Sequence, residues 1–133
     1  MKYLLALIAE EGGMEDASPE EMKAEMDRWD AYSRASVEKG AFVAGEALQP
    51  SEAASTVRIK EGEAPTVTDG PFAESKEQLG GFYLFECNDL DEALEYAKGI
   101  PYRDGYVEVR PVMDFSEYGY ESPAETAAKA SAS

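Results

Sequence analysis

Histidine is absent from this chain, and cysteine and cationic residues are scarce. The 133 residues include one cysteine, Cys87, and 12 Lys plus Arg against 28 Asp plus Glu, which gives a formal net charge of −16. Without histidine the chain cannot build a Ser-His-Asp triad, a Cys-His dyad or a histidine-ligated zinc site. One cysteine cannot form an internal disulfide, which fits a reducing compartment.

The acidic charge excludes two classes of partner. Nucleic acids are bound by clustered cations that neutralise phosphates, and anionic membranes likewise attract basic segments. The apolar run at residues 4–9 is too short for a membrane span, and Glu10 and Glu11 follow it at once, unlike a signal peptide. We therefore expect a cytoplasmic protein that binds neither nucleic acid nor membrane.

The same residue types argue against a bound metal. Transition-metal sites usually include imidazole or thiolate ligands, and no Asp-x-Asp-x-Asp-Gly calcium loop occurs in the chain. The densest acidic cluster, residues 88–92, has the pattern of a helix N-terminus instead. The sequence predicts no metal and no cofactor.

Strand and helix patterns alternate along a chain long enough for one domain. Residues 2–9 predict a central strand. Ser18-Pro19-Glu20-Glu21 predicts the start of a helix that ends at Gly40. Strands are predicted at 41–47, 82–87 and 106–110, a hairpin at 56–60 and 65–68, and a second helix from Asp89 to Gly99. The first helix is expected to bury a face consisting of Met22, Met26, Trp29, Ser33 and Val37.

Without the hairpin this order is βαββαβ, an α+β arrangement of the ferredoxin-like type. Two helices can cover only one face of such a sheet. The outward positions Glu108 and Arg110 indicate that the other face is neither bare nor a dry core, and a second copy of the sheet is its simplest cover. We therefore expect a homodimer with a domain at residues 1–114. The Ala- and Ser-rich remainder, 115–133, is expected to be a frayed, partly disordered tail.

Three stretches carry a family resemblance: residues 56–58, residues 67–83 with Asp-Gly-Pro-Phe at 69–72, and residues 107–112. Together they strongly resemble the YCII-related family, and more narrowly its subgroup named after the Asp-Gly-Pro-Phe (DGPF) tetrapeptide. The resemblance covers about residues 1–113. It implies a dimeric α+β barrel built from ferredoxin-like protomers.

The resemblance implies no particular activity. Some YCII-like relatives are thought to act through a His-Asp pair, and one branch includes a dehydrochlorinase. The histidine position of those relatives falls on Trp29 here, and the aspartate position falls on Ile100, so that mechanism is not carried over. Members of the DGPF subgroup are often encoded beside extracytoplasmic-function sigma factors, which implies a regulatory context.

The central motif supplies the candidate catalytic residues, Asp69 and Lys76. Asp69 either accepts backbone hydrogen bonds within its own turn or points a carboxylate into a pocket as a general base. Lys76 is either a solvated neighbour of Glu74 and Glu77 or an anion clamp, with Glu74 beside it in the site. Pro71 and Phe72 are expected to be structural, with Phe72 buried as an anchor for the loop.

Strand residues supply the candidate substrate-binding groups. Arg58 and Arg110 either form interface ion pairs, with Glu108 or Asp69 as partner, or grip an anionic ligand. Tyr83 has a hydroxyl that can position a ligand, whereas Trp29 is expected to be core packing.

Two functions of different classes follow. The first is a small-molecule site in the barrel that binds a small anionic molecule, either for binding alone or for a cofactor-independent lyase or isomerase reaction. The second is a regulatory module whose acidic surface docks a basic partner related to a sigma factor. The two are distinguished by whether Asp69, Lys76, Arg58 and Arg110 converge on one cavity.

Overall fold

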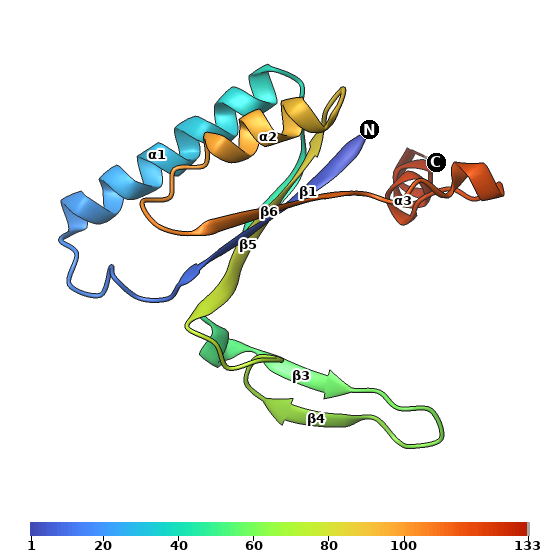
Figure 1. The fold of residues 1–133 in the computed structure, drawn as a ribbon, viewed down its shortest axis with the longest axis horizontal. Helices are drawn as coiled ribbons and strands as arrows, with labels where there is room; N and C mark the ends of the chain where they lie inside the picture. The colour runs from blue at the N-terminus through green and yellow to red at the C-terminus, as the bar shows by residue number, and fades with distance from the viewer. Residues whose placement is uncertain (133) are drawn as a thin grey trace.

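A four-stranded antiparallel sheet with two helices on one face forms the body of the protein (Figure 1). The computed structural model describes residues 1–132. Neighbouring strands lie in the order β2-β5-β1-β6, which is the ferredoxin-like order with a separate β3-β4 hairpin inserted. The elements are β1 (Lys2–Glu10), α1 (Pro19–Glu38), β2 (Phe42–Ala47), β3 (Ser55–Arg58), β4 (Thr66–Asp69), β5 (Glu77–Glu86), α2 (Leu90–Lys98), β6 (Tyr106–Pro111) and α3 (Pro123–Ala132), with short 3-10 turns at Ser51–Ala53 and Phe115–Tyr118. The predicted α+β class is confirmed.

The inner face of the sheet carries the core. Leu5 on β1 is fully buried between its register partners Tyr83 on β5 and Val109 on β6. Phe85 is also fully buried, and its ring lies 5.2 Å from that of Tyr83 and 4.9 Å from that of Tyr96 in α2. Because side chains alternate along a strand, these inward residues leave every second position to the outer face.

The first helix begins and ends where the sequence predicts. The Ser18 hydroxyl accepts from the Glu21 N–H, and the Glu21 carboxylate accepts from the Ser18 N–H, which is a complete capping box. At the other end Gly40 has a φ of +78°, a left-handed conformation that suits glycine.

The predicted buried face of α1 is only partly correct. Trp29 and Ser33 lie toward the sheet, but Val37 is 56% exposed and Met26 is 65% exposed. Tyr32 and Ser36 lie toward the sheet instead, since the Tyr32 ring contacts those of Tyr83 and Phe85 and the side chain of Ser36 is 1% exposed. Apolar spacing alone misjudged the rotation of the helix, because an aromatic phenol and a small hydroxyl pack here better than a valine.

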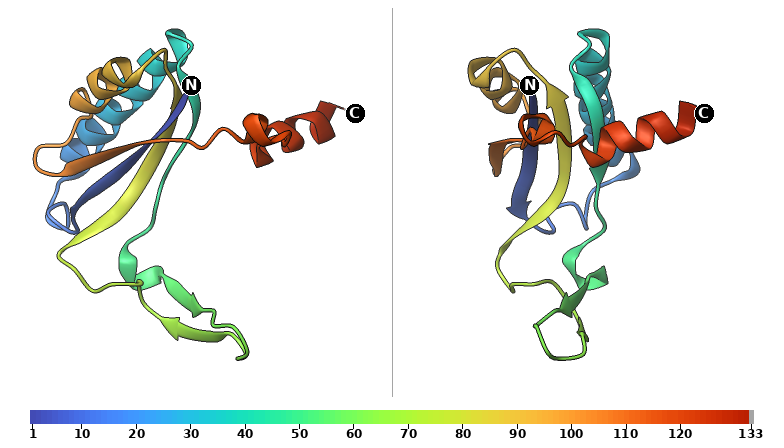
Figure 2. Two further views of the ribbon diagram at one scale, coloured as in Figure 1. Left: turned by 45° about the vertical axis from the view of Figure 1, so that its right-hand side comes forward. Right: turned by 90° about the vertical axis from the view of Figure 1, so that its right-hand side faces the viewer.

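The outer face of the sheet is apolar, and no helix or strand within residues 1–132 packs over it (Figures 1 and 2). Its central positions, read from the strand register, are Leu4, Ala6, Ile8, Phe82 and Leu84. At the β6 edge, Glu108 lies opposite Ala6 and Arg110 opposite Leu4, and the two charged side chains form an ion pair of 2.5 Å. A face of this composition is typical of a surface that another protein layer covers.

The sequence predicted a frayed tail, but α3 is a regular helix. Ser122 and Glu125 form a capping pair at its start, Lys129 forms an ion pair with Glu121, and its alanines have high helix propensity. The helix stands away from the sheet (Figure 2). The domain limit at residue 114 stays a prediction, and Ser133 lies outside the described residues.

None of the helices in residues 1–132 is both long and apolar enough to cross a membrane.

The core at Leu5 generates the first prediction. Leu5→Ala should lower the free energy of unfolding by roughly 2–5 kcal/mol, because it removes a fully buried side chain. The matched control is Leu48→Ala, at a leucine that is 47% exposed, which should cost less than about 1 kcal/mol. Urea unfolding followed by circular dichroism measures both. Equal losses for the two variants would contradict the assignment of the core.

Candidate functional site

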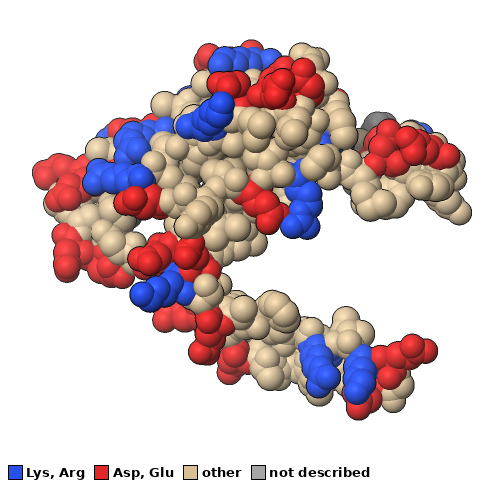
Figure 3. Space-filling view, viewed as in Figure 1, with Lys and Arg blue, Asp and Glu red and all other residues tan. Residues whose placement is uncertain are grey.

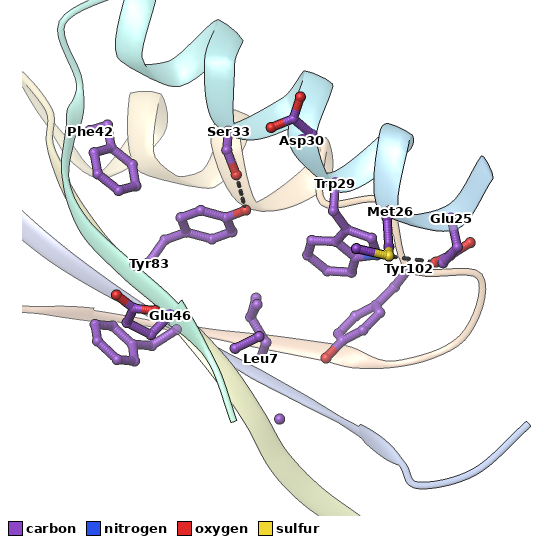
Figure 4. Close-up of a pocket in the computed structure, with 14 residues that line it drawn as sticks. Leu7, Glu25, Met26, Trp29, Asp30, Ser33, Phe42, Glu46, Tyr83 and Tyr102 are labelled. Carbon is purple, nitrogen blue, oxygen red and sulfur yellow. Dashed lines mark hydrogen bonds between the residues drawn. The ribbon is translucent and has the colours of Figure 1, made fainter. Parts of the chain in front are cut away.

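A cavity of about 560 Å³ lies between the middle of α1 and the β2-β5 side of the sheet (Figure 4). Its size falls within the roughly 300–1,000 Å³ that is typical of small-molecule sites. The lining residues come from α1, β1, β2, β5 and the α2-β6 loop: Leu7, Glu25, Met26, Trp29, Asp30, Ser33, Phe42, Gly45, Glu46, Ala47, Gly80, Phe82, Tyr83 and Tyr102. None of these is Lys or Arg.

Aromatic rings form much of the cavity wall. Trp29 and Tyr102 meet edge to face with ring centroids 5.2 Å apart, and Phe42 meets Tyr83 in the same way at 6.3 Å. Trp29 donates its indole N–H to the Glu25 carboxylate at 3.1 Å, which fixes the ring orientation. The expectation that Trp29 is core packing is therefore incomplete, because the ring packs on the core and also lines the cavity.

A hydrogen bond between two hydroxyl groups of the cavity wall joins Ser33 on α1 to Tyr83 on β5. Their hydroxyl oxygens are 2.6 Å apart, and either one can donate. The Tyr83 side chain is almost fully buried. Two hydroxyls that share one hydrogen bond retain one proton and free lone pairs, so they can both donate to and accept from a bound molecule.

Gly45 on β2 makes room for the Tyr83 ring. A Cβ at this position would lie 2.8 Å from Tyr83 Cδ1 and 3.2 Å from Phe42 Cε2. Any larger residue would therefore push one of these rings into the cavity. The sequence showed Gly45 only as an interruption of a strand.

Three acidic residues line the wall: Glu25 and Asp30 are paired along the helix, whereas Glu46 on β2 has no ion pair among the described residues. Glu25 accepts from Arg28 at 2.9 Å, and Asp30 accepts from Arg34 at 2.7 Å. Arg28 also donates to the Pro101 carbonyl at 2.9 Å, which ties α1 to the loop that carries Tyr102. Glu25 and Asp30 therefore hold the wall in place, and their charges are balanced by the two arginines.

The shifted pKa values near the cavity belong to tyrosines. Burial, followed by the neighbouring Tyr83 and Tyr96, raises the pKa of Tyr32 well above its ordinary value, and burial alone raises the pKa of Tyr102. Both phenols therefore stay protonated at neutral pH, and the Tyr32 hydroxyl donates to the Tyr96 carbonyl at 2.7 Å. Burial likewise raises the pKa of the Cys87 thiol, which disfavours a nucleophilic thiolate.

The hydrogen bonds that hold the DGPF turn, residues 69–72, differ from those expected. Gly70 donates its N–H to the Ala54 carbonyl at 2.8 Å, and the Thr56 hydroxyl donates to the Gly70 carbonyl at 2.8 Å. Asp69 is exposed at the end of β4. The burial expected for Phe72 is wrong: its side chain is 93% exposed, because no part of its own chain packs against the loop it sits on.

Glu74 and Lys76 lie in the exposed segment that leads into β5. Lys76 borders a surface depression with Glu10, Glu11 and Ser51, so acidic side chains surround it. The segment is held by Gln78, whose side-chain amide donates to the Ala73 and Ser75 carbonyls at 2.9 and 3.0 Å. Sequence reasoning missed this role of Gln78.

Within one protomer the predicted charged residues do not share a cavity. Arg58 and Asp69 lie at opposite ends of the β3-β4 pairing, where Arg58 faces Thr66 and Asp69 faces Ser55. Glu108 and Arg110 pair with each other on the outer sheet face. Of the predicted residues, Tyr83 alone lines the cavity under α1. The roles of Asp69, Lys76, Arg58, Glu74, Glu108 and Arg110 in a site stay predictions.

Among residues 1–132, no group of three or more His, Cys, Asp or Glu side chains is placed to hold a metal ion. The cavity instead presents rings, aliphatic side chains and a hydroxyl pair, a combination that suits an organic molecule.

An antiparallel α+β protomer with a cavity under its first helix is the class of protein that these observations define. The profile of the YCII-related domain matches residues 1–116, so the chain belongs to the YCII-related family. It is similar to an uncharacterised protein of Rhizobium meliloti (strain 1021), with 41% identity over 115 residues that cover 84% of this chain and 92% of the relative.

The buried Tyr32 predicts a pH dependence of stability. Its folded-state pKa is raised, so the unfolded state loses this proton first, and the free energy of unfolding falls as the pH rises through about 10. Tyr32→Phe removes this contribution and should flatten the decline between roughly pH 9.5 and 11.5. It should also cost about 1 kcal/mol at neutral pH, because the 2.7 Å hydrogen bond to the Tyr96 carbonyl is lost.

Tyr118→Phe is the control, since Tyr118 is 70% exposed and its substitution should keep the wild-type pH profile. Chemical unfolding at a series of alkaline pH values gives the three profiles. A Tyr32→Phe profile parallel to that of the wild type would show that Tyr32 is not protected in the folded state.

Proposed function

We propose that this protein binds a small, uncharged, ring-bearing molecule in the cavity under α1. The carrying observation is the cavity itself: an aromatic and aliphatic wall, one inward hydroxyl pair at Ser33 and Tyr83, and no lining Lys or Arg. An apolar body would be buried against the rings, while one polar group exchanges hydrogen bonds with the two hydroxyls.

Binding is better supported than catalysis at this site. The two wall carboxylates on α1, Glu25 and Asp30, are engaged by Arg28, Arg34 and Trp29, and the phenol of Tyr102 has a raised pKa. Such groups hold and orient a ligand but do not offer a poised general base. A lyase or isomerase reaction would have to draw its base from Glu46, the carboxylate of the described wall that has no ion pair, or from Asp69 or Glu74, which lie outside this cavity.

The anionic ligand expected from the sequence has no lysine or arginine to pair with in this cavity. Arg58, Lys76 and Arg110 remain candidates for binding anions elsewhere on the protein, with Glu108 as the partner of Arg110. In the proposed account these cations are separate from the cavity that holds the ring-bearing ligand.

We further propose that the protein is a cytoplasmic homodimer of the DGPF subgroup, joined through its outer sheet face. The Asp-Gly-Pro-Phe sequence at residues 69–72 supports the subgroup. The uncovered apolar positions of β1 and β5 support a second copy as the cover, which would produce a dimeric α+β barrel.

A regulatory role is the second candidate, and the net charge of −16 favours it. An acidic surface of this strength attracts a basic partner, such as a region of a sigma factor, over long distances at low salt. This candidate predicts binding that weakens steeply with ionic strength. Binding of an uncharged ligand in the cavity would not show that dependence.

The single tryptophan provides a direct test of the cavity. Trp29 lines it, so an uncharged probe such as N-phenyl-1-naphthylamine should quench Trp29 emission by energy transfer as it binds. The sulfonated analogue 1-anilinonaphthalene-8-sulfonate should bind more weakly, because the lining has no Lys or Arg to pair with its charge.

Ala47→Phe fills part of the cavity from β2 and should weaken binding of the uncharged probe by about tenfold or more. Ala31→Phe is the matched control, at an exposed position of α1 outside the cavity wall, and should leave binding unchanged. Equal binding by both variants, or a preference for the sulfonate, would overturn the proposed site.

A further inference from the structure

The inserted hairpin, residues 55–69, forms an arm with one apolar face. Val57 on β3 pairs directly with Val67 on β4, and Ile59 continues the same side just beyond β3. The opposite side carries Thr56, Arg58 and Lys60. An amphipathic pattern of this kind is characteristic of a strand pair that packs one face against another layer.

No described part of the same chain covers this apolar face. Val57 is 52% exposed, Val67 67% and Ile59 79%. The arm extends away from the sheet in all views (Figures 1 and 2). A hairpin of two strands is marginally stable in water unless a further strand or layer packs on it. The regular pairing of β3 with β4 therefore points to a partner that is missing from the isolated protomer.

We propose that the arm docks its apolar face on a second copy of this chain, so that each protomer of a dimer clasps the other. This inference rests on the dimer proposed above and adds a distinct contact to it. The outer sheet face, the arm and the C-terminal segment border one open hollow (Figure 3). A second copy seated on the outer sheet face would lie within reach of the arm, and two-fold symmetry would make the contact reciprocal.

Charge favours a second copy as the occupant. The chain has a net charge of −16, and among the described residues neither Arg58 nor Lys60 on the arm takes part in an ion pair within the protomer. Arg58 and Lys60 lie on the side opposite the docking face, so they act only by attracting an acidic second copy at long range as it approaches. The middle of the outer sheet face is apolar, and its edge pair Glu108–Arg110 is neutral, so two copies can meet there without strong repulsion.

Val67→Glu tests the arm, because it places a charge on the apolar face. It should weaken the dimer by about tenfold or more in sedimentation equilibrium. Thr66→Glu is the matched control: it is the adjacent residue, adds the same charge and lies on the opposite face, beside Arg58. It should leave association within about twofold of the wild type. Circular dichroism checks that both variants keep the fold.

A cross-linking experiment is independent of any loss of stability. Ile59→Cys can carry a benzophenone photoprobe, because the native Cys87 is buried and the new thiol is exposed. Irradiation at dimer-forming concentrations should yield covalent dimers, with cross-links mapped to the partner. If the wild type is dimeric, but Val67→Glu associates as strongly as the wild type and no cross-linked dimer forms, the arm contact alone is overturned. A monomeric wild type at micromolar concentration would overturn the dimer and the arm contact together.

Discussion

Coverage of the sheet on one face only is the constraint on which the rest of this structure depends. Both α1 and α2 pack on the inner face, and no element of the described residues 1–132 covers the outer face (Figure 2). The inner face therefore holds the core around Leu5 and Phe85 and, where α1 stands away from β2, the cavity. The outer face is left apolar, and a second protein layer is needed to remove it from water.

Local signals in the sequence predicted most of the fold. The capping residues Ser18 and Asp89 mark the starts of both packed helices, and the βαββαβ order leads to the observed sheet. Features that depend on tertiary packing, such as which side chains of a helix are buried, were predicted less well. Val37 fits an apolar stripe but is exposed, whereas Ser36 is buried because its hydroxyl donates to the Ser33 carbonyl at 2.7 Å. The C-terminal helix was missed because composition outweighed its Ser122 capping residue.

The candidate site was harder to predict because its members are apolar and distant in sequence. Ser33, Tyr83 and Tyr102 are brought together only by the packing of α1 and of the α2-β6 loop on the sheet. Reasoning from charged residues led instead to Asp69, Lys76 and Arg58, which stand on the arm and its connection to β5. Tyr83 was found because its hydroxyl can position a ligand. The same argument applied to the Trp29 indole N–H would have pointed to the cavity.

Nuclear magnetic resonance mapping of the bound probe tests the central claim, that the ligand site lies under α1. With 15N-labelled protein, titration of N-phenyl-1-naphthylamine should shift the Trp29 indole N–H and the backbone amides of Gly45 and Tyr83, because these groups border the cavity. The amides of Arg58, Asp69 and Lys76 should stay unshifted. Shifts confined to those three residues, with the Trp29 indole unchanged, would contradict the account.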